Sequence, residues 1–190
     1  MLRRLYPLAL SALVAGCVSQ QDAQSALEQA QADITHVHTY VMRYAPSAFD
    51  TIMAEYGAAK VSFDAGRYRE ARRRAGAASE LATAGGRAAT AQKQNMEHAF
   101  LVVRDSLPVL LAAIEGRVEE LSAADGPPAG VAPAEVDTAR AAVMDLREAW
   151  NKAARAYDRG DLRTATHAAT ALLQEAGRVQ GTLAPPPPLP

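Results

Sequence analysis

Apolar residues recur every three or four positions along most of this chain, which is the periodicity of amphipathic α-helices. One such stripe contains Phe49, Ile52, Tyr56, Ala59 and Phe63. No segment shows the strict alternation that is typical of a half-buried β-strand. The pattern predicts helices over residues 22–43, 47–65, 67–85, 88–121 and 133–159, and a last helix that ends near Gly181. We therefore expect an all-α protein, a bundle of about five or six antiparallel helices.

Proline and glycine residues mark the expected helix boundaries. Pro46 disfavours the helical conformation in the residue before it, so Ser47 is the expected cap of the second helix. The glycine pair at 85–86 predicts a break, and Pro108 predicts a kink or a restart within the fourth helix. Pro133 by contrast suits the first position of a helix.

The chain contains an internal repeat. A shift of 94 residues aligns 45–82 with 139–176, and ten of the 38 aligned pairs are identical. The shift also aligns large apolar or aromatic residues with one another. The aligned pairs are Phe49 with Val143, Ile52 with Leu146, Tyr56 with Trp150, Phe63 with Tyr157 and Tyr68 with Leu162. We expect two copies of one helical hairpin.

Small residues and a glycine have the same spacing in both copies. In the first copy these residues are Ala59, Gly66, Tyr68 and Ala71. In the second copy they are Ala153, Gly160, Leu162 and Ala165. This pattern resembles the central part of a tetratricopeptide hairpin, in which small residues let two antiparallel helices approach closely. Because the period is 94 residues and not about 34, we expect tetratricopeptide-like hairpins in a bundle, not adjacent standard repeats.

The N-terminal residues have the pattern of an export signal. Arg3 and Arg4 precede a short apolar run over residues 5–14. About ten apolar residues are too few to cross a hydrocarbon layer of about 30 Å as a helix. The N-terminal segment ends in Leu13-Val14-Ala15-Gly16-Cys17, which resembles the lipobox of bacterial lipoproteins. The resemblance implies cleavage before Cys17 and a diacylglycerol group on its thiol; an ordinary secretory signal is the alternative.

This resemblance sets the expected organisation and location. Val18, where inner-membrane lipoproteins carry Asp, implies transport to the outer membrane, with the protein facing the periplasm. Loss of the signal changes the formal charge from −1 to −3, because two Arg and no acidic residue are removed. The expected segments are a signal peptide (1–16), an acylated linker (17–21), a single helical domain (22–183) and a proline-rich tail (184–190).

Composition excludes several classes of protein. With 190 residues and a charge of −1, the chain lacks the basic excess of a nucleic-acid-binding protein. One Cys is too few for a disulfide framework or a thiolate zinc site. A hydrophobic content of 49 % and 43 Ala, with few aromatic residues, predict a globular core built largely from small side chains.

The sequence contains no catalytic constellation. His36 and His38 lie two positions apart, which places them about 200° apart on a helix and prevents joint metal ligation. No Gly-x-Ser-x-Gly motif and no glycine-rich phosphate loop with its Lys occur. We expect a non-enzymatic protein without a metal or cofactor, and a hydrolase is the least favoured class.

Two groups of residues are candidate binding sites. Arg69, Arg72 and Arg73 lie in an arginine-rich stretch and are a candidate patch for an acidic partner or a phosphate-bearing envelope glycolipid. The alternative is a solvated helix face. The aromatic residues at matched repeat positions are a candidate groove for a partner helix or peptide, with core packing as the alternative; they are Tyr56, Phe63, Trp150 and Tyr157.

The lipobox, the Ala-rich helices and the motif that begins at Tyr44-Ala45-Pro46 resemble a family of uncharacterised bacterial envelope lipoproteins. Some members of that family are fused to peptidoglycan-binding domains, and the resemblance implies no functional residue. We expect an outer-membrane lipoprotein that binds another envelope protein. The alternatives are a module that binds peptidoglycan or a small envelope ligand, and a pilotin-like assembly factor for a secretion or pilus system.

Overall fold

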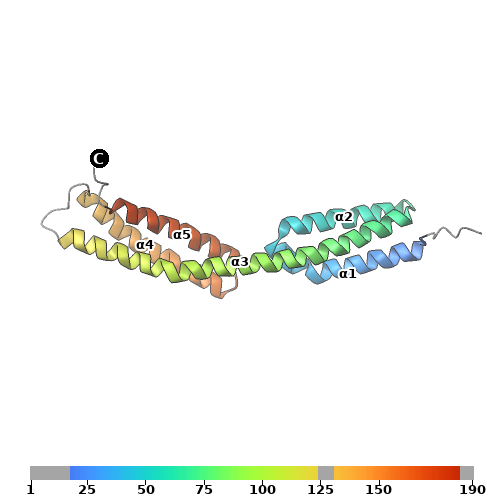
Figure 1. Cartoon of the computed structure of the whole chain (residues 1–190), viewed down its shortest axis with the longest axis horizontal. Helices are drawn as coiled ribbons and strands as arrows, with labels where there is room; N and C mark the ends of the chain where they lie inside the picture. Colours follow the sequence, from blue (N-terminus) through green and yellow to red (C-terminus); the bar gives the residue numbers. More distant parts are fainter. Residues whose placement is uncertain (1–17, 124–130, 185–190) are drawn as a thin grey trace, which may run out of the picture. The chain divides into compact units, whose positions relative to one another are not determined.

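A computed structural model describes residues 18–123 and 131–184, which form five α-helices (Figure 1). No strand occurs in these two ranges, so the predicted all-α class is confirmed. The expected cleavage site and proline-rich tail lie outside the described residues, except that Ala184 is described. The helices are α1 (Gln20–Tyr44), α2 (Pro46–Asp64), α3 (Tyr68–Ala123), α4 (Pro133–Asp158) and α5 (Leu162–Thr182).

The chain divides into two compact units, Met1–Thr90 and Ala91–Pro190. We call them the N-terminal and C-terminal units. The single domain expected over residues 22–183 is therefore better described as two units, each with its own core. The division falls within α3, because its first part packs with α1 and α2 and its later part packs with α4 and α5.

The N-terminal unit has a core dominated by alanine. Small side chains let helices pack at short distances while still removing apolar surface from water. Between helices, the Ser79 hydroxyl of α3 also donates a hydrogen bond of 2.6 Å to the Asp33 carboxylate of α1. The buried apolar residues are Ala23, Ala30, Ile34, Val41, Tyr44, Ile52, Ala59, Ala71, Ala75, Ala78, Ala82 and Ala89.

The glycine pair at 85–86 does not break the helix, contrary to the sequence-based expectation, because α3 continues through both residues. A Cβ atom at Gly85 would lie 3.0 Å from Cδ1 of Ile52 and 3.5 Å from Cγ1 of Val41. Ile52 belongs to α2 and Val41 to α1. The missing side chain therefore lets α3 approach both neighbouring helices, and this packing outweighs the low helix propensity of glycine.

The close approach at Gly85 yields a stability prediction. Replacement of Gly85 by leucine should lower the free energy of unfolding by about 1–3 kcal/mol, because the new side chain has no room beside Ile52. The same replacement at Gly76, also in α3, should be neutral or stabilising by up to about 1 kcal/mol, since no atom lies within 4 Å of its Cβ position. Urea unfolding followed by circular dichroism measures both changes. Equal midpoints for the two variants would contradict the close approach.

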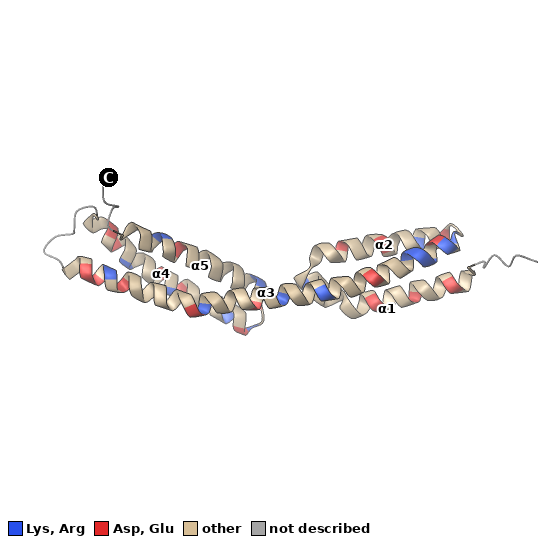
Figure 2. Ribbon diagram, viewed as in Figure 1, with Lys and Arg blue, Asp and Glu red and all other residues tan. Residues whose placement is uncertain are grey.

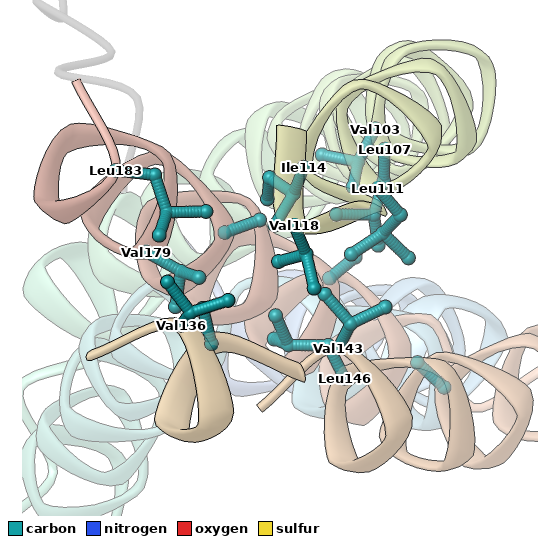
Figure 3. Close-up of a cluster of buried hydrophobic side chains, with 14 of the residues drawn as sticks. Val103, Leu107, Leu111, Ile114, Val118, Val136, Val143, Leu146, Val179 and Leu183 are labelled. Atoms are coloured by element: carbon teal, nitrogen blue, oxygen red, sulfur yellow. The ribbon is translucent and has the colours of Figure 1, made fainter. Parts of the chain in front are cut away.

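The C-terminal unit has a core of larger aliphatic side chains (Figure 3). They come from the later part of α3, from α4, and from α5 with its C-cap, and they converge between the three helices. The residues labelled in the figure are Val103, Leu107, Leu111, Ile114, Val118, Val136, Val143, Leu146, Val179 and Leu183.

Pro108 lies inside α3 without ending it. Proline provides no backbone N–H, so one intrahelical hydrogen bond is lost at this point. Pro108 itself is exposed, whereas Leu107 and Leu111 are 0 % and 3 % exposed and hold this part of α3 against the core. At the start of α2, Pro46 occupies the first helical turn and Ala45 is the N-cap, so the expectation that Ser47 caps this helix is wrong.

The two helical hairpins use the same turn. Gly66 and Gly160 have φ angles of 73° and 75°, the left-handed region that glycine adopts without steric cost. The Gly66 N–H donates to the Phe63 carbonyl at 2.9 Å, and the Gly160 N–H donates to the Tyr157 carbonyl at 2.8 Å. The next N–H in each copy reaches back five residues at 2.9 Å, which completes a Schellman motif. The shift of 94 residues therefore relates two turns with the same hydrogen bonds.

Candidate functional site

Cys17 lies outside the described residues, which begin at Val18. The helix that follows is capped at Ser19: its hydroxyl accepts from the Asp22 N–H at 3.1 Å, and its own N–H donates to the Asp22 carboxylate at 3.0 Å. The hydrogen bonds from Ser19, with a smaller contribution from the charge of Arg72, hold the pKa of Asp22 below its usual value. None of the described helices is long and apolar enough to cross a membrane.

The arginine-rich stretch at the start of α3 contains two different kinds of side chain. Arg74 donates to Glu70 at 2.9 Å and reaches Glu55 of α2 at 3.3 Å, and Arg67 pairs with Glu70 at 3.2 Å. The hydrogen bond from Arg74, supported by the charges of the surrounding arginines, holds the pKa of Glu70 below its usual value. These two arginines are therefore already neutralised within the N-terminal unit.

The other three arginines, Arg69, Arg72 and Arg73, are exposed, and we call them the basic patch. None of them makes an ion pair within 4 Å of its charged group with a described residue. In Figure 2, blue segments that mark Lys and Arg lie close together near the start of α3, in the N-terminal unit. The patch is the candidate anion-binding surface that the sequence predicted.

Two open surface hollows adjoin the basic patch. One has a volume of about 590 Å³ and the other of about 460 Å³, and both are lined by Arg69, Arg73 and Val18. Glu70 lines the first hollow and Glu80 the second. The structure therefore brings the basic patch next to the residue that follows Cys17, which the sequence did not predict because these residues are about 50 positions apart.

The four candidate groove residues fall into two pairs. Tyr56 and Phe63 belong to the N-terminal unit, whereas Trp150 and Tyr157 belong to the C-terminal unit. The Tyr56 hydroxyl donates to the Gln31 side chain at 3.1 Å. Phe63 contacts Tyr68 edge to face, with ring centroids 5.5 Å apart. Neither unit by itself contains a groove lined by all four.

Trp150 and Tyr157 pack on a residue that was not among the candidate site residues. Phe100 is 2 % exposed, and its ring lies nearly parallel to both others, with centroid distances of 5.3 Å to Trp150 and 4.2 Å to Tyr157. Residues seven apart on a helix are separated by about 10.5 Å along its axis, so Phe100 fits between them. In the sequence, Phe100 and Val103 are spaced as residues on one face of a helix. This spacing can indicate that Phe100 is buried, but it cannot indicate which residues Phe100 contacts.

The described part of the chain contains no group of three His, Cys, Asp or Glu side chains that could hold a metal ion. His36 and His38 are exposed, and the His38 ring contacts Phe49 edge to face with centroids 4.9 Å apart. These histidines therefore lie on the surface of the N-terminal unit as separate side chains.

Several large apolar side chains are exposed on the C-terminal unit. Val102 and Val109 of α3 are 50 % and 70 % exposed, and their spacing of seven places them on one face of the helix. Met144 of α4 is also 70 % exposed. Scattered exposed apolar residues are common, but two on one helix face are a candidate contact surface for another protein.

Comparisons of the chain with protein-family models, curated proteins and solved structures found no match.

Proposed function

We propose that this protein is an outer-membrane lipoprotein, anchored by an acyl group on Cys17 and facing the periplasm, whose helical units bind another protein of the cell envelope. The observation that carries the proposal is the segment Leu13-Val14-Ala15-Gly16-Cys17, which follows a basic and then an apolar run. Several acyl chains would hold the protein at a bilayer surface, since each buried CH₂ contributes about 0.8 kcal/mol.

The role as a binding protein is supported by the surface of the C-terminal unit. Among the described residues, Val102 and Val109 are exposed apolar side chains on the side of α3 away from its own core, with the exposed Asp105 between them. Apolar side chains on a helix face are a common contact surface for a partner helix or peptide. These two valines support a protein partner more directly than Trp150 and Tyr157, which stack on buried Phe100.

The test is photocrosslinking in cells from a benzoylphenylalanine placed at Val109. We expect a specific crosslinked product in the membrane fraction, because Val109 is 70 % exposed and its replacement disturbs no core contact. The matched control is the same substitution at Thr170 of α5, which is exposed but polar. If neither Val109 nor Met144 captures a protein while the variants accumulate normally, the role as an adaptor is wrong.

Two alternative functions make different predictions in simple assays. A module that binds peptidoglycan should sediment with purified cell-wall sacculi in the absence of other proteins, whereas an adaptor should not. A pilotin-like assembly factor should crosslink to a subunit of a secretion or pilus system.

A further inference from the structure

We propose that the basic patch of Arg69, Arg72 and Arg73 binds the anionic phospholipid headgroups of the membrane to which Cys17 is attached. This inference rests on the proposed acylation of Cys17. It adds a second contact with the bilayer, one that orients the N-terminal unit instead of leaving it free on a lipid tether.

The first argument is position. Val18 lines both hollows beside the patch, together with Arg69 and Arg73. Cys17 is the residue directly before Val18, and consecutive Cα atoms are about 3.8 Å apart. A lipid attached to Cys17 would therefore enter the bilayer one residue from Val18, and Val18 lies beside Arg69 and Arg73, so we expect these arginines at the level of the headgroups.

The second argument is charge. The three arginines of the patch are exposed and make no ion pair with a described residue, unlike Arg67 and Arg74 beside them. Three acidic groups face the patch: Glu70 and Glu80 line the hollows beside it, and the carboxylate of Asp22 interacts with the charge of Arg72. Glu70 already binds both neutralised arginines. The patch thus keeps an excess of positive charge, although the mature chain has a formal charge of −3.

The third argument is the chemistry and room of the site. A guanidinium group is planar and can donate two parallel hydrogen bonds to a phosphate, which makes arginine well suited to headgroup binding. The second hollow is also lined by Gly76 and Ala77, which leave space beside the arginines. No atom lies within 4 Å of the position of a Cβ at Gly76. Phosphates therefore have open access to the patch.

An acidic protein surface is the other class of ligand that these charges would attract. The position beside Cys17 favours the lipid, because acylation brings headgroups to the patch at high local concentration whereas a protein would have to compete for the same space. Labelling in lipid alone and in whole envelopes separates the two.

The experiment uses the acylated protein, purified from membranes and placed in nanodiscs of phosphatidylcholine with or without phosphatidylglycerol. Phenylglyoxal modifies accessible arginines, and peptide mass spectrometry gives the rate at each position. We expect phosphatidylglycerol to slow the labelling of the three patch arginines by roughly tenfold at low salt. High salt should restore the rate, because screening weakens contacts between exposed charges. Labelling of Arg104, Arg155 and Arg159 in the C-terminal unit should not change.

A matched pair of variants tests whether the patch itself makes the contact. Arg67 lines the first hollow beside the patch, so phosphatidylglycerol should also slow its labelling in the unaltered protein. In the variant Arg69→Gln, Arg72→Gln, Arg73→Gln, Arg67 should lose this protection. The control variant, which removes three charges from the C-terminal unit, should keep it; its changes are Arg104→Gln, Arg155→Gln and Arg159→Gln.

The outcomes separate this inference from the proposed anchor. An acylated protein whose patch arginines react equally in both kinds of nanodisc would overturn headgroup binding and leave the anchor intact. Protection in whole envelopes but not in nanodiscs would replace the lipid with an acidic protein. A protein without an acyl group on the Cys17 peptide would overturn both the anchor and this inference.

Discussion

Replacement of Cys17 by serine should remove the protein from the outer-membrane fraction and abolish incorporation of labelled palmitate. The serine hydroxyl is a much weaker nucleophile than the cysteine thiol, so the diacylglycerol group should not be transferred to it. Without this group, the cleavage that follows acylation should also fail. We expect a precursor that is stalled at its export step or released without an anchor, an all-or-none change that gel mobility and membrane fractionation both detect.

The matched control for Cys17→Ser is Ser19→Ala, two positions further along the chain. This change removes the side-chain cap of α1 and should lower stability by about 1 kcal/mol. It leaves the thiol and the residues before it intact, so palmitate incorporation and membrane association should persist. A Cys17→Ser protein that still fractionates with the outer membrane would show that another part of the chain provides the anchor.

Replacement of Phe100 by alanine should be the most destabilising single change in the C-terminal unit. The ring is 2 % exposed and lies between Trp150 and Tyr157. Loss of a buried aromatic ring leaves a cavity and typically costs about 3–5 kcal/mol. Each stacked pair is worth about 0.5–1.5 kcal/mol beyond its buried area, so Phe100→Leu should recover much of the volume but not the stacking.

Fluorescence of Trp150 provides a specific measurement, because it is the only tryptophan in the chain and it contacts Phe100 directly. Urea unfolding followed at this residue should show a much lower midpoint for Phe100→Ala. The control is Val102→Ala, two positions away on α3 and 50 % exposed, which should change stability by no more than about 0.5 kcal/mol. Similar midpoints for the two variants would contradict the packing of the three rings.

The start of α4 and the two hairpin turns could be predicted because local chemistry determines them. Pro133 begins α4 as expected, since its fixed φ angle suits the first helical turn. Gly66 and Gly160 adopt the left-handed conformation that ends a helix. In each case the conformation of the boundary is determined by one or two adjacent residues.

Gly85 and Pro108 show where local rules fail. Both residues disfavour helix by themselves, yet α3 passes through them. At Gly85 the deciding contacts are with Val41 and Ile52, which lie more than 30 positions away in the sequence. At Pro108 the buried neighbour Leu107 belongs to a core shared with α4 and α5. Propensity is a small energy per residue, and long-range packing overrides it.

For the candidate sites, too, the sequence identified residues, whereas contacts between distant residues determined what those residues do. The arginine-rich stretch was visible in the sequence, but the ion pair from Arg74 to Glu55 distinguishes neutralised arginines from those of the basic patch. The position of Val18 beside the patch likewise depends on how α1 packs along α3. Periodicity predicted the helix over residues 88–121 but not that its Phe100 packs between Trp150 and Tyr157.

The sequence alone thus determined the helical class, the repeated glycine turns and the segment on which the proposed lipid anchor rests, because these depend on residues close together in the chain. Only the tertiary structure decided that one long helix serves two cores, which arginines remain unpaired and that the basic patch lies beside Val18. Each of these depends on contacts between residues far apart in sequence, which periodicity and composition do not specify.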